Sequence, residues 1–555
     1  DETLINKAID ENIANQNLYT ARHPFTQKPL LTTPWQLTLE SEAIQRIENG
    51  KGAVSAICSK QKVSEFIKAK EQEMAFALSP SQKKAMTTFL TSTDRFIAIQ
   101  GYAGTGKTTM LRLTRELASL QGYEIRGITA GSAAANELRH KGGLNASTFA
   151  RELGRLQNQK QDLSKTIFVV DEASMLSNPQ GHKIIKLAEQ FNTQLKIIGD
   201  KAQLPSPSSG KLFSVIQDYG IKTVAMTDNL RQKDSELRES AIHAGRGEIY
   251  DAVDKLTHVE TLDTYLKRVD YISSKWLSLT PEERQNTLCF APTHRNRQDI
   301  TQILRNALIQ EGTLTGQEHL QPILKERNLT GIKLRNAAYY SQNDIIRFNH
   351  TIQRYNIKAG DYLTVGQVTN KNKHNNILIL KHENGQAIKF KLSSLPEFRT
   401  ENKDLERPVE VYRREQLSLM AGDQIQWKRN SEHNGIRNSE LATIRQINNE
   451  GITIITEDNQ TLHLPHGAKE LRHLDHGYVL TTYATQGKDK KRGLGLIESQ
   501  NRFASTIQNY YVETTRGIWE MIVVTDDKDH LVKAITTNNS DKYSSMDMVD
   551  SDTLK

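Results

Sequence analysis

A glycine-rich segment, GYAGTGKT at 101–108, has the residue types and spacing of a phosphate-binding loop, G-x-x-x-x-G-K-[ST]. Its glycines would let backbone N–H groups approach phosphate oxygens without a Cβ clash, and the helix expected after it would add its N-terminal partial positive charge. Lys107 would reach the β- and γ-phosphates of ATP, and the Thr108 hydroxyl would bind Mg²⁺. The residues expected to hold the nucleotide are Gly101, Gly104, Gly106, Lys107, Thr108 and Thr109.

Polar residues also follow two predicted buried strands. In IFVVDEAS at 167–174, Asp171 could bind Mg²⁺ directly or through water, and Glu172 could accept a proton from an attacking water molecule. In KIIGDKAQLPSPSSG at 196–210, Gln203 could hydrogen-bond the γ-phosphate or that water. An Asp-Glu pair at a strand end suits water as the nucleophile better than a phosphate-acceptor group, so the pattern indicates ATP hydrolysis.

Hydrolysis also requires positive charge where the transition state becomes negative. Arg231 in TDNLRQKD and Arg516 in YYVETTRG both lie outside the segment that carries the loop and the carboxylates. Taken singly, each arginine is more often a surface or ion-paired residue, so physical reasoning alone does not select either of them.

The elements that must position these residues are short apolar runs with helical stretches between them. This alternation predicts buried parallel strands of a doubly wound α/β domain, at 96–99, 125–128, 167–170 and 195–198. A second set of such runs predicts a second α/β domain, with strands at 287–291, 478–482 and 521–524.

From about 326 to 466 the texture differs, with alternating and β-branched runs separated by turns. Asn384-Gly385 and Glu450-Gly451 lie where hairpin turns would be, so one or two small β-barrels are expected inside the second α/β domain. The predicted division is a polar accessory region at 1–75, a first ATPase domain at 76–225, a second domain at 226–325 and 467–535, the insertion at 326–466, and a disordered tail at 536–555.

Bulk composition limits the class of protein. The formal net charge of +8 permits a polyanionic partner such as nucleic acid, although a mildly basic soluble protein would have the same charge. No stretch approaches the roughly 20 apolar residues of a membrane-spanning helix, and no signal peptide is visible. Cys58 and Cys289 form no metal or redox pattern, so a reducing cytoplasm is expected. Because the chain begins with Asp, we expect it to be part of a longer polypeptide.

The order of eight segments resembles the motif set of superfamily 1 helicases: LSPSQKKAM, GYAGTGKTTML, ITAGSAAANEL, VVDEASM, IIGDKAQL, NLRQ, YVLTTYATQG and YYVETTRG. The similarity is greatest to the helicase part of conjugative relaxase–helicases of the TraI and TrwC type, in the RecD-like branch. It covers roughly residues 25–535, including LLTTPWQLTLESEAI ahead of the loop. As a set these motifs are very specific, and one alone would not be.

The resemblance implies an α/β fold with two RecA-like parallel-sheet P-loop domains, ATP between them, and an SH3-like β-barrel in the insertion. It implies that Gln82 reads adenine, that Gln203 senses the γ-phosphate, and that Arg231 and Arg516 are arginine fingers. It also implies 5′→3′ translocation on single-stranded DNA. The residues expected to contact that DNA are Thr129, Ser132, Gln486 and Lys488.

Lys488 belongs to a departure from the family pattern. After Gln486-Gly487 the chain runs KDKKRG, where relatives usually have small or acidic residues. These basic side chains could bind a DNA phosphate, and a solvated basic turn is an equally good interpretation.

The implied partners are a conjugative relaxosome and a type IV coupling protein, without membrane insertion. The implied location is the bacterial cytoplasm, with passage to the recipient cell as part of a longer protein. The histidines show no metal-binding triad of a relaxase, so the nicking domain is expected to be absent from this chain.

Two alternatives remain open. One is a DNA-binding or recruitment module that has lost catalysis, which the intact set of candidate catalytic residues argues against. The other is a recombination or repair helicase of the RecD type, which the LLTTPWQLTLESEAI segment argues against.

Overall fold

The computed structural model describes residues 2–22, 29–74, 76–157, 162–206, 210–256, 258–369, 376–396, 407–431, 434–501, 504–538 and 544–548. The chain forms two compact units: unit 1 comprises Asp1–Gln302 and Val479–Lys555, and unit 2 comprises Ile303–Tyr478. None of the helices in these ranges has the length and apolar character needed to cross a membrane.

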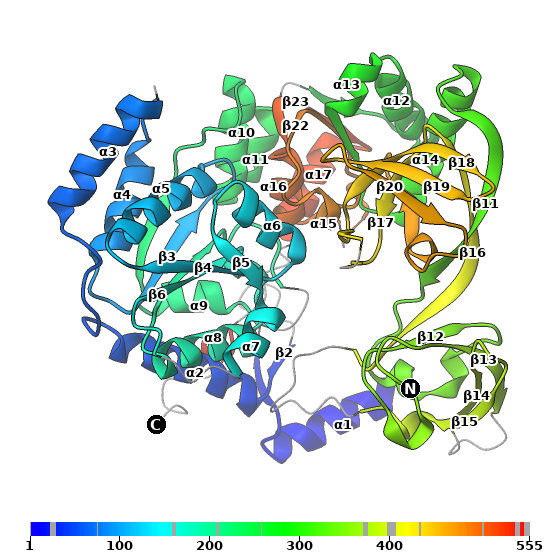
Figure 1. Ribbon diagram of the computed structural model, residues 1–555, viewed down its shortest axis with the longest axis horizontal. Helices are drawn as coiled ribbons and strands as arrows, with labels where there is room; N and C mark the ends of the chain where they lie inside the picture. Colours follow the sequence, from blue (N-terminus) through cyan, green and yellow to red (C-terminus); the bar gives the residue numbers. More distant parts are fainter. Residues whose placement is uncertain are drawn as a thin grey trace. The chain divides into compact units, whose positions relative to one another are not determined.

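The first sheet of unit 1 has six strands whose neighbours all pair in parallel (Figure 1). The strand order is β5 (Asn145–Thr148), β4 (Glu124–Thr129), β6 (Thr166–Asp171), β7 (Gln194–Gly199), β3 (Phe96–Gly101) and β8 (Lys222–Met226). Four of these strands coincide with the first set of predicted apolar runs. The predicted α/β fold with a parallel sheet is therefore confirmed.

Helices cover both faces of this sheet, because successive buried residues of a strand point to opposite sides. Ile99 packs into one core and its neighbour Ala98 into the other. The Ile99 core lies beneath α3 (Lys60–Met74), α4 (Pro80–Thr91), α5 (Lys107–Leu120) and α6 (Ser132–His140). The Ala98 core lies beneath α2 (Pro34–Asn49), α7 (Phe149–Gln157), α8 (Asn178–Gln190) and α9 (Leu212–Asp218).

Residues 544–548, late in the sequence, contact α2 and β1 (Tyr19–Arg22), which lie early in it. Ahead of α2 come α1 (Glu2–Ala14) and an antiparallel pair, β1 and β2 (Pro29–Thr32). The Thr33 side chain caps α2 by accepting from Gln36 N, and Pro34 opens the helix, as is common at helix N-termini.

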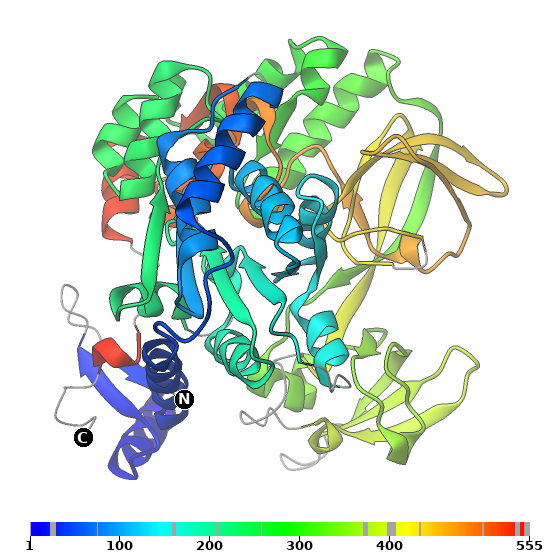
Figure 2. The same cartoon turned by 60° about the vertical axis from the view of Figure 1, so that its left-hand side comes forward.

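The tail predicted to be disordered contains an ordered segment, residues 544–548, which Figure 2 shows in red beside the blue β1 and β2. Glu40 is buried, and its Oε2 accepts from Ser544 Oγ at 2.8 Å and from Met546 N at 3.1 Å. A buried carboxylate needs such partners, so the prediction of disorder is wrong here. Residues 539–543 and 549–555 lie outside the described residues.

The second sheet of unit 1 has four strands that pair in parallel, in the order β10 (Thr287–Phe290), β22 (Lys490–Leu496), β23 (Gly517–Thr525) and β9 (His258–Thr261). Its helices are α10 (Ser235–Arg246), α11 (Ile249–Asp254), α12 (Tyr265–Leu277), α13 (Pro281–Gln285), α14 (His294–Gln310), α15 (Thr482–Thr485), α16 (Ile507–Thr514) and α17 (Lys528–Thr537). Strands β10 and β23 confirm two predicted strands.

The third predicted strand of this set, at 478–482, is wrong. Leu480 forms only an isolated bridge to Phe290, and Thr481 caps α15 by accepting from Ala484 N. The strand that the prediction missed is β22, which begins with Lys490 to Arg492, the basic run for which a DNA contact and a solvated turn were equally good interpretations.

Unit 2 contains two antiparallel sheets. The six-stranded sheet has the order β11 (Thr315–Glu326), β16 (Val409–Ala421), β12 (Ile345–Phe348), β13 (Tyr362–Thr369), β14 (Ile377–Lys381) and β15 (Ala387–Lys391). The five-stranded sheet has the order β20 (Thr461–Pro465), β19 (Gly451–Thr456), β18 (Leu441–Asn448), β17 (Gln424–Trp427) and β21 (Leu474–His476). The hairpins β14–β15 and β18–β19 lie at the two predicted turns.

Asp423, in the turn between β16 and β17, is fully buried in unit 2. Its carboxylate accepts from Arg305 Nε and Nη2, both at 2.9 Å, and from Tyr478 OH at 2.8 Å. Removing this carboxylate would leave the buried Arg305 guanidinium without its counter-charge, which costs more than the pair itself contributes.

We therefore expect Asp423→Ala to lower the free energy of unfolding of unit 2 by about 3–5 kcal/mol, measured by circular dichroism in urea. The control is Glu415→Ala, which removes a partly exposed pair with Lys325 at 3.1 Å and should cost no more than about 1 kcal/mol. Equal losses in the two variants would contradict the prediction.

Candidate nucleotide-binding site

The glycine-rich loop connects β3 to α5, as the sequence predicts. Gly104 (φ 80°) and Gly106 (φ 73°) have left-handed backbone conformations that other residues rarely adopt. A Cβ atom at Gly101 would lie 2.5 Å from Lys107 Cδ, so a larger residue there would displace the lysine side chain from this position. No described side chain caps α5 at Gly106, and the amides of its first turn can therefore bind an anion.

Lys107 now rests on the loop itself. Its Nζ donates to Gly101 O at 2.6 Å and is 3.4 Å from Tyr102 O. Bonds from an ammonium to neutral carbonyls are weaker than those to phosphate oxygens, so a triphosphate could replace them. Thr108 and Thr109 are partly exposed in the first turn of α5. The loop therefore fits the phosphates of a nucleotide.

Asp171 and Glu172 lie at the end of β6, as predicted. Glu172 has a φ of 53°, a left-handed conformation that is costly for glutamate and is often found at functional sites. Burial, together with repulsion from Asp171, raises the pKa of Glu172 to about 7. A carboxyl group with a pKa near neutrality can exchange a proton with water under ordinary conditions.

A magnesium ion would find oxygen ligands beside the loop. Burial raises the pKa of Asp171, and the nearby charge of Lys107 opposes that shift. The Asp171 Oδ1 atom accepts from Glu172 N at 2.9 Å. A carboxylate and the Thr108 hydroxyl are hard oxygen donors of the kind that Mg²⁺ prefers, so the donor set fits this ion.

Arg231 and Arg516, 285 positions apart in the printed numbering, meet at one carboxylate of unit 1. Arg231 Nη1 lies 3.1 Å from Asp489 Oδ1, and Arg516 Nη1 lies 3.4 Å from the same atom. Burial and repulsion from Arg231 lower the pKa of Arg516 to about 10. Arg516 and Glu172 are close enough that each charge shifts the pKa of the other group. The two predicted finger residues therefore belong to the same charged cluster as Glu172.

Two further residues of this cluster escape motif reasoning. Asp200 accepts from Gln100 Nε2 at 3.0 Å and from Tyr511 OH at 2.9 Å. The Tyr511 hydroxyl also accepts from Ala103 N of the loop at 2.7 Å. These buried bonds tie the loop to α16, the helix that leads to Arg516. The available signal was the strand-end position of Asp200, and nothing in the sequence pairs it with Tyr511.

Gln203 and Gln82 are both held by protein groups. Gln203 Nε2 donates to Asp200 Oδ2 at 3.2 Å, which places its amide beside the loop's hydrogen-bond network. Gln82 is 2% exposed; its Oε1 accepts from Ser79 N, and its Nε2 donates to Thr105 O at 3.2 Å. In this conformation Gln82 links the loop to the first turn of α4, and its contact with adenine stays a prediction.

The predicted DNA contacts divide into two groups. Thr129 is fully buried and its hydroxyl donates to Gly131 O at 2.7 Å, so its contact with DNA stays a prediction that would require this side chain to become exposed. Ser132, Gln486 and Lys488 are partly exposed. A Cβ at Gly487 would lie 3.8 Å from Glu137 of α6, the helix that Ser132 begins. These three candidates therefore lie on neighbouring elements.

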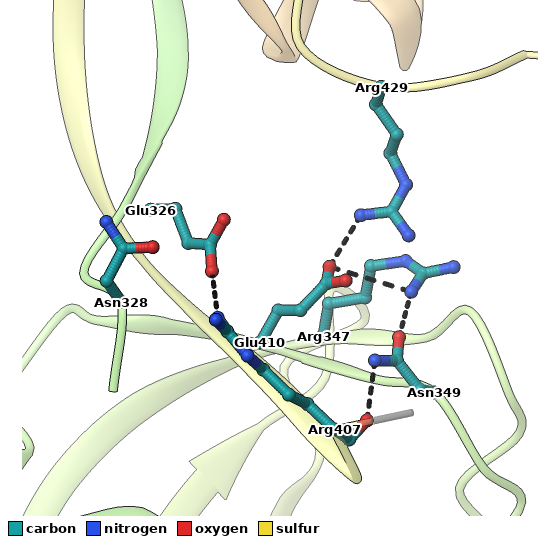
Figure 3. A pocket seen from close by; sticks show the side chains of 7 residues that line it. All are labelled: Glu326, Asn328, Arg347, Asn349, Arg407, Glu410 and Arg429. Carbon is teal, nitrogen blue, oxygen red and sulfur yellow. Dashed lines mark hydrogen bonds and ion pairs between the residues drawn. The ribbon is translucent and has the colours of Figure 1, made fainter. Parts of the chain in front are cut away.

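A separate polar cavity of about 560 Å³ lies in unit 2 (Figure 3). In Figure 3, Glu410 binds Arg429 at 2.6 Å and lies 3.7 Å from Arg347, while Arg407 binds Glu326 at 2.6 Å. Burial opposes the ionisation of Glu410, but the hydrogen bonds that it accepts outweigh burial and lower its pKa. Each arginine has a carboxylate partner within unit 2, although Arg347 and Arg429 share Glu410, and we assign the cavity no ligand.

The model of the family described as AAA domain matches residues 77–265, which include the loop, both carboxylates and Arg231. Multifunctional conjugation protein TraI of Escherichia coli is 20% identical over 559 residues, covering 91% of this chain and 30% of that protein. The probable conjugal transfer protein TraA of Sinorhizobium fredii is 28% identical over 275 residues, covering 48% of this chain and 25% of that protein. This chain is homologous to these conjugation proteins. It spans less than a third of their length.

Solved structures of Pif1 helicases are also similar. A structure of Pif1 helicases that addresses DNA unwinding at forked double-stranded DNA has 15% identity and a TM-score of 0.45. The match covers 85% of this chain and 96% of the Pif1 chain. Pif1 from Candida albicans has 13% identity and a TM-score of 0.43, covering 82% and 96%. Bacteroides Pif1 with ADP-AlF3 and single-stranded DNA has 14% identity and a TM-score of 0.39, covering 85% and 96%.

Proposed function

We propose that this chain is an ATP-dependent DNA helicase that translocates 5′→3′ on single-stranded DNA. The observation that carries the proposal is the charged cluster of unit 1, in which Lys107, Glu172 and the arginine pair come together from two parallel sheets. A phosphate loop, a carboxyl group for water and buried arginines are the groups that ATP hydrolysis uses. A module that had lost catalysis would have no reason to keep all of them together.

Each group has a distinct part in hydrolysis. Lys107 and the first-turn amides of α5 would bind the β- and γ-phosphates of ATP. Thr108 and Asp171 would hold Mg²⁺, which neutralises phosphate charge when bound. Glu172 would accept a proton as water attacks the γ-phosphate, and Arg231 and Arg516 would stabilise the negative charge that develops there. The products are ADP and inorganic phosphate.

DNA is the proposed track because two kinds of observation support a polyanion. The chain has a net charge of +8, and Ser132, Gln486 and Lys488 are partly exposed on neighbouring elements of unit 1. We propose that these residues contact a single strand, and that each ATP cycle closes and opens the two α/β domains to move along it.

The proposed cellular task is unwinding plasmid DNA during conjugative transfer, in the bacterial cytoplasm. Homology to TraI and TraA supports this setting, and the proposed partners are a relaxosome and a type IV coupling protein. A coupling protein that is retained by the immobilised chain, and not by a blank resin, would support the partnership. A coupling protein that passes through both would contradict it.

Duplexes with a single-stranded 5′ or 3′ tail test the function directly. In the presence of ATP and Mg²⁺, we expect unwinding from the 5′ tail only, and an ATPase rate that rises when single-stranded DNA is added. Unwinding from the 3′ tail alone would contradict the proposed direction. An ATPase rate that does not respond to single-stranded DNA would contradict a DNA motor.

A further inference from the structure

The Asp489 carboxylate bridges the two candidate arginine fingers. Its Oδ1 atom lies 3.1 Å from Arg231 Nη1 and 3.4 Å from Arg516 Nη1. The Asp489 side chain is 33% exposed, whereas those of Arg231 and Arg516 are 21% and 3% exposed. One partly exposed carboxylate oxygen therefore pairs with both guanidinium groups, which are more deeply buried than it is. The proposed hydrolysis assigns no role to Asp489.

Arg231 and Arg516 repel each other, and the negative charge of Asp489 offsets that repulsion. Burial and repulsion from Arg231 lower the pKa of Arg516, and the charge of Asp489 opposes that shift. Within the described part of the chain, the other hydrogen bonds of the two guanidinium groups go to uncharged oxygens. Arg231 Nη1 donates to Thr515 O at 3.2 Å, and Arg516 donates from Nε to Val512 O at 2.8 Å and from Nη2 to Thr515 Oγ1 at 3.1 Å. A γ-phosphate offers the same oxyanion chemistry as a carboxylate, so the two would compete for the same guanidinium groups.

Asp489 is also joined directly to the residues proposed to contact DNA. It follows Gln486, Gly487 and Lys488, and precedes β22. Lys488 N donates to Thr485 O at 3.0 Å, and Lys490 N donates to Arg516 O at 3.2 Å. Asp489 is thus flanked by the end of α15 and by the backbone of Arg516. A DNA strand that binds the side chain of Lys488 and displaces it would also move Asp489, the next residue.

We propose that Asp489 is a brake on ATP hydrolysis that single-stranded DNA releases. Without DNA, its carboxylate holds Arg231 and Arg516, and their charge is not available to the γ-phosphate. When a strand binds at residues 486–488, Asp489 withdraws and the two guanidinium groups turn to the phosphate. Asp489 acts through the arginines and is a positioning residue. The inference rests on the proposed function.

Asp489→Asn tests the brake, because asparagine keeps the size of the side chain and removes its charge. Without DNA, we expect its ATPase rate to rise about fivefold over wild type, the effect of losing an ion pair of about 1 kcal/mol. At saturating single-stranded DNA, the two proteins should agree within about twofold. The stimulation by DNA therefore falls about fivefold. Asp489→Glu restores the charge and should return the DNA-free rate toward that of wild type.

The matched control is Asp254→Asn, which removes a surface carboxylate 3.5 Å from Lys528 in the same unit and should change neither rate. A DNA-free rate in Asp489→Asn that is equal to or below wild type, with stimulation intact, overturns the brake. A wild-type protein without ATPase activity, or without stimulation by DNA, overturns the proposed function instead. Equal thermal unfolding midpoints in all variants would exclude misfolding as the cause of a changed rate.

Discussion

Lys107→Ala should lower kcat for ATP hydrolysis by roughly 10²–10³-fold. Lys107 carries the only charged side chain of the loop segment GYAGTGKT, so no neighbour in the loop can replace its contact with the β- and γ-phosphates. Its ammonium now bonds two backbone carbonyls, which are neutral, so the free energy of unfolding should change by less than about 1.5 kcal/mol. Steady-state ATPase measurements at saturating single-stranded DNA would give the loss.

Lys201→Ala is the matched control for this prediction. Lys201 is an exposed lysine that follows Asp200 at the end of β7, so its removal takes one positive charge from the same region. Its ATPase rate should equal that of wild type. A Lys107→Ala variant that retains the wild-type rate would mean that the phosphates bind elsewhere.

Glu172→Gln should lower the rate of hydrolysis by roughly 10²–10⁴-fold while ATP still binds. Glutamine has the shape of glutamate but cannot accept the proton of the attacking water. Lys107 and the loop are unchanged, so the affinity for a fluorescent ATP analogue should stay close to that of wild type. A variant that loses affinity and hydrolysis together would show that Glu172 supports the loop and does not act as the base.

The raised pKa of Glu172 also predicts how the rate of ATP hydrolysis depends on pH. A base must be ionised, and a pKa of about 7 means that its ionised fraction grows as the pH rises through neutrality. The wild-type rate should therefore fall about tenfold for each pH unit below 6 and level off above about 8. The residual rate of Glu172→Gln should lack this acid limb.

The same pKa shift makes the stability of the fold fall as the pH rises, whereas the rate of hydrolysis increases. The folded-state pKa is about 7 and the ordinary value is 4.5, so the folded chain holds the proton more tightly. Stability from this group is fully present below about pH 4.5 and is lost as the pH rises through about 7. Glutamine does not ionise, so Glu172→Gln should gain in thermal unfolding midpoint over wild type between pH 5 and pH 8.

Sequence patterns could predict the loop and the strand-end carboxylates because their structural context is local. The apolar run, the glycine-rich segment and the helix follow one another in the chain, and the structure has β3, the loop and α5 in that order. The start of α2 is also determined locally, because Thr33 caps the helix and Pro34 is its first residue.

Strand β22 could not be predicted in this way because it has little apolar pattern. Arg492 is balanced by Glu520 on the neighbouring strand, a contact that the sequence does not reveal. The strand packs through glycines: a Cβ at Gly493 would lie 2.4 Å from Met521 Sδ, and one at Gly495 would lie 2.3 Å from the ring of Phe290. Close packing of this kind depends on the opposing side chain, so a basic run followed by glycines does not predict a strand.

The network around Asp200, Tyr511 and Asp489 could not be predicted for a related reason. Tyr511 OH bonds Asp200 across 311 residues and Ala103 N across 408 residues. The role of Asp489 can be recognised only in the folded chain, where Arg231 and Arg516 lie beside it. The spacing of residues along the chain does not reveal such long-range contacts, which form only in the folded structure.

The strand order of the second sheet affects how the chain folds as it is synthesised. Among the described strands, β9 pairs with β23 and β10 pairs with β22, and both partners follow unit 2 in the sequence. At roughly 5–20 residues per second, the ribosome needs roughly 10–40 s to deliver the partner of β10. Until then β9 and β10 present unpaired edges that invite wrong pairing.

The first sheet does not have to wait, because all six of its strands precede Ser235, where α10 begins. Its phosphate loop can therefore form early, when the residues that will become α16 and Arg516 have not yet been added. A nascent chain would be able to bind ATP before it could hydrolyse it, and a bound ligand would stabilise the first sheet while the second is still incomplete.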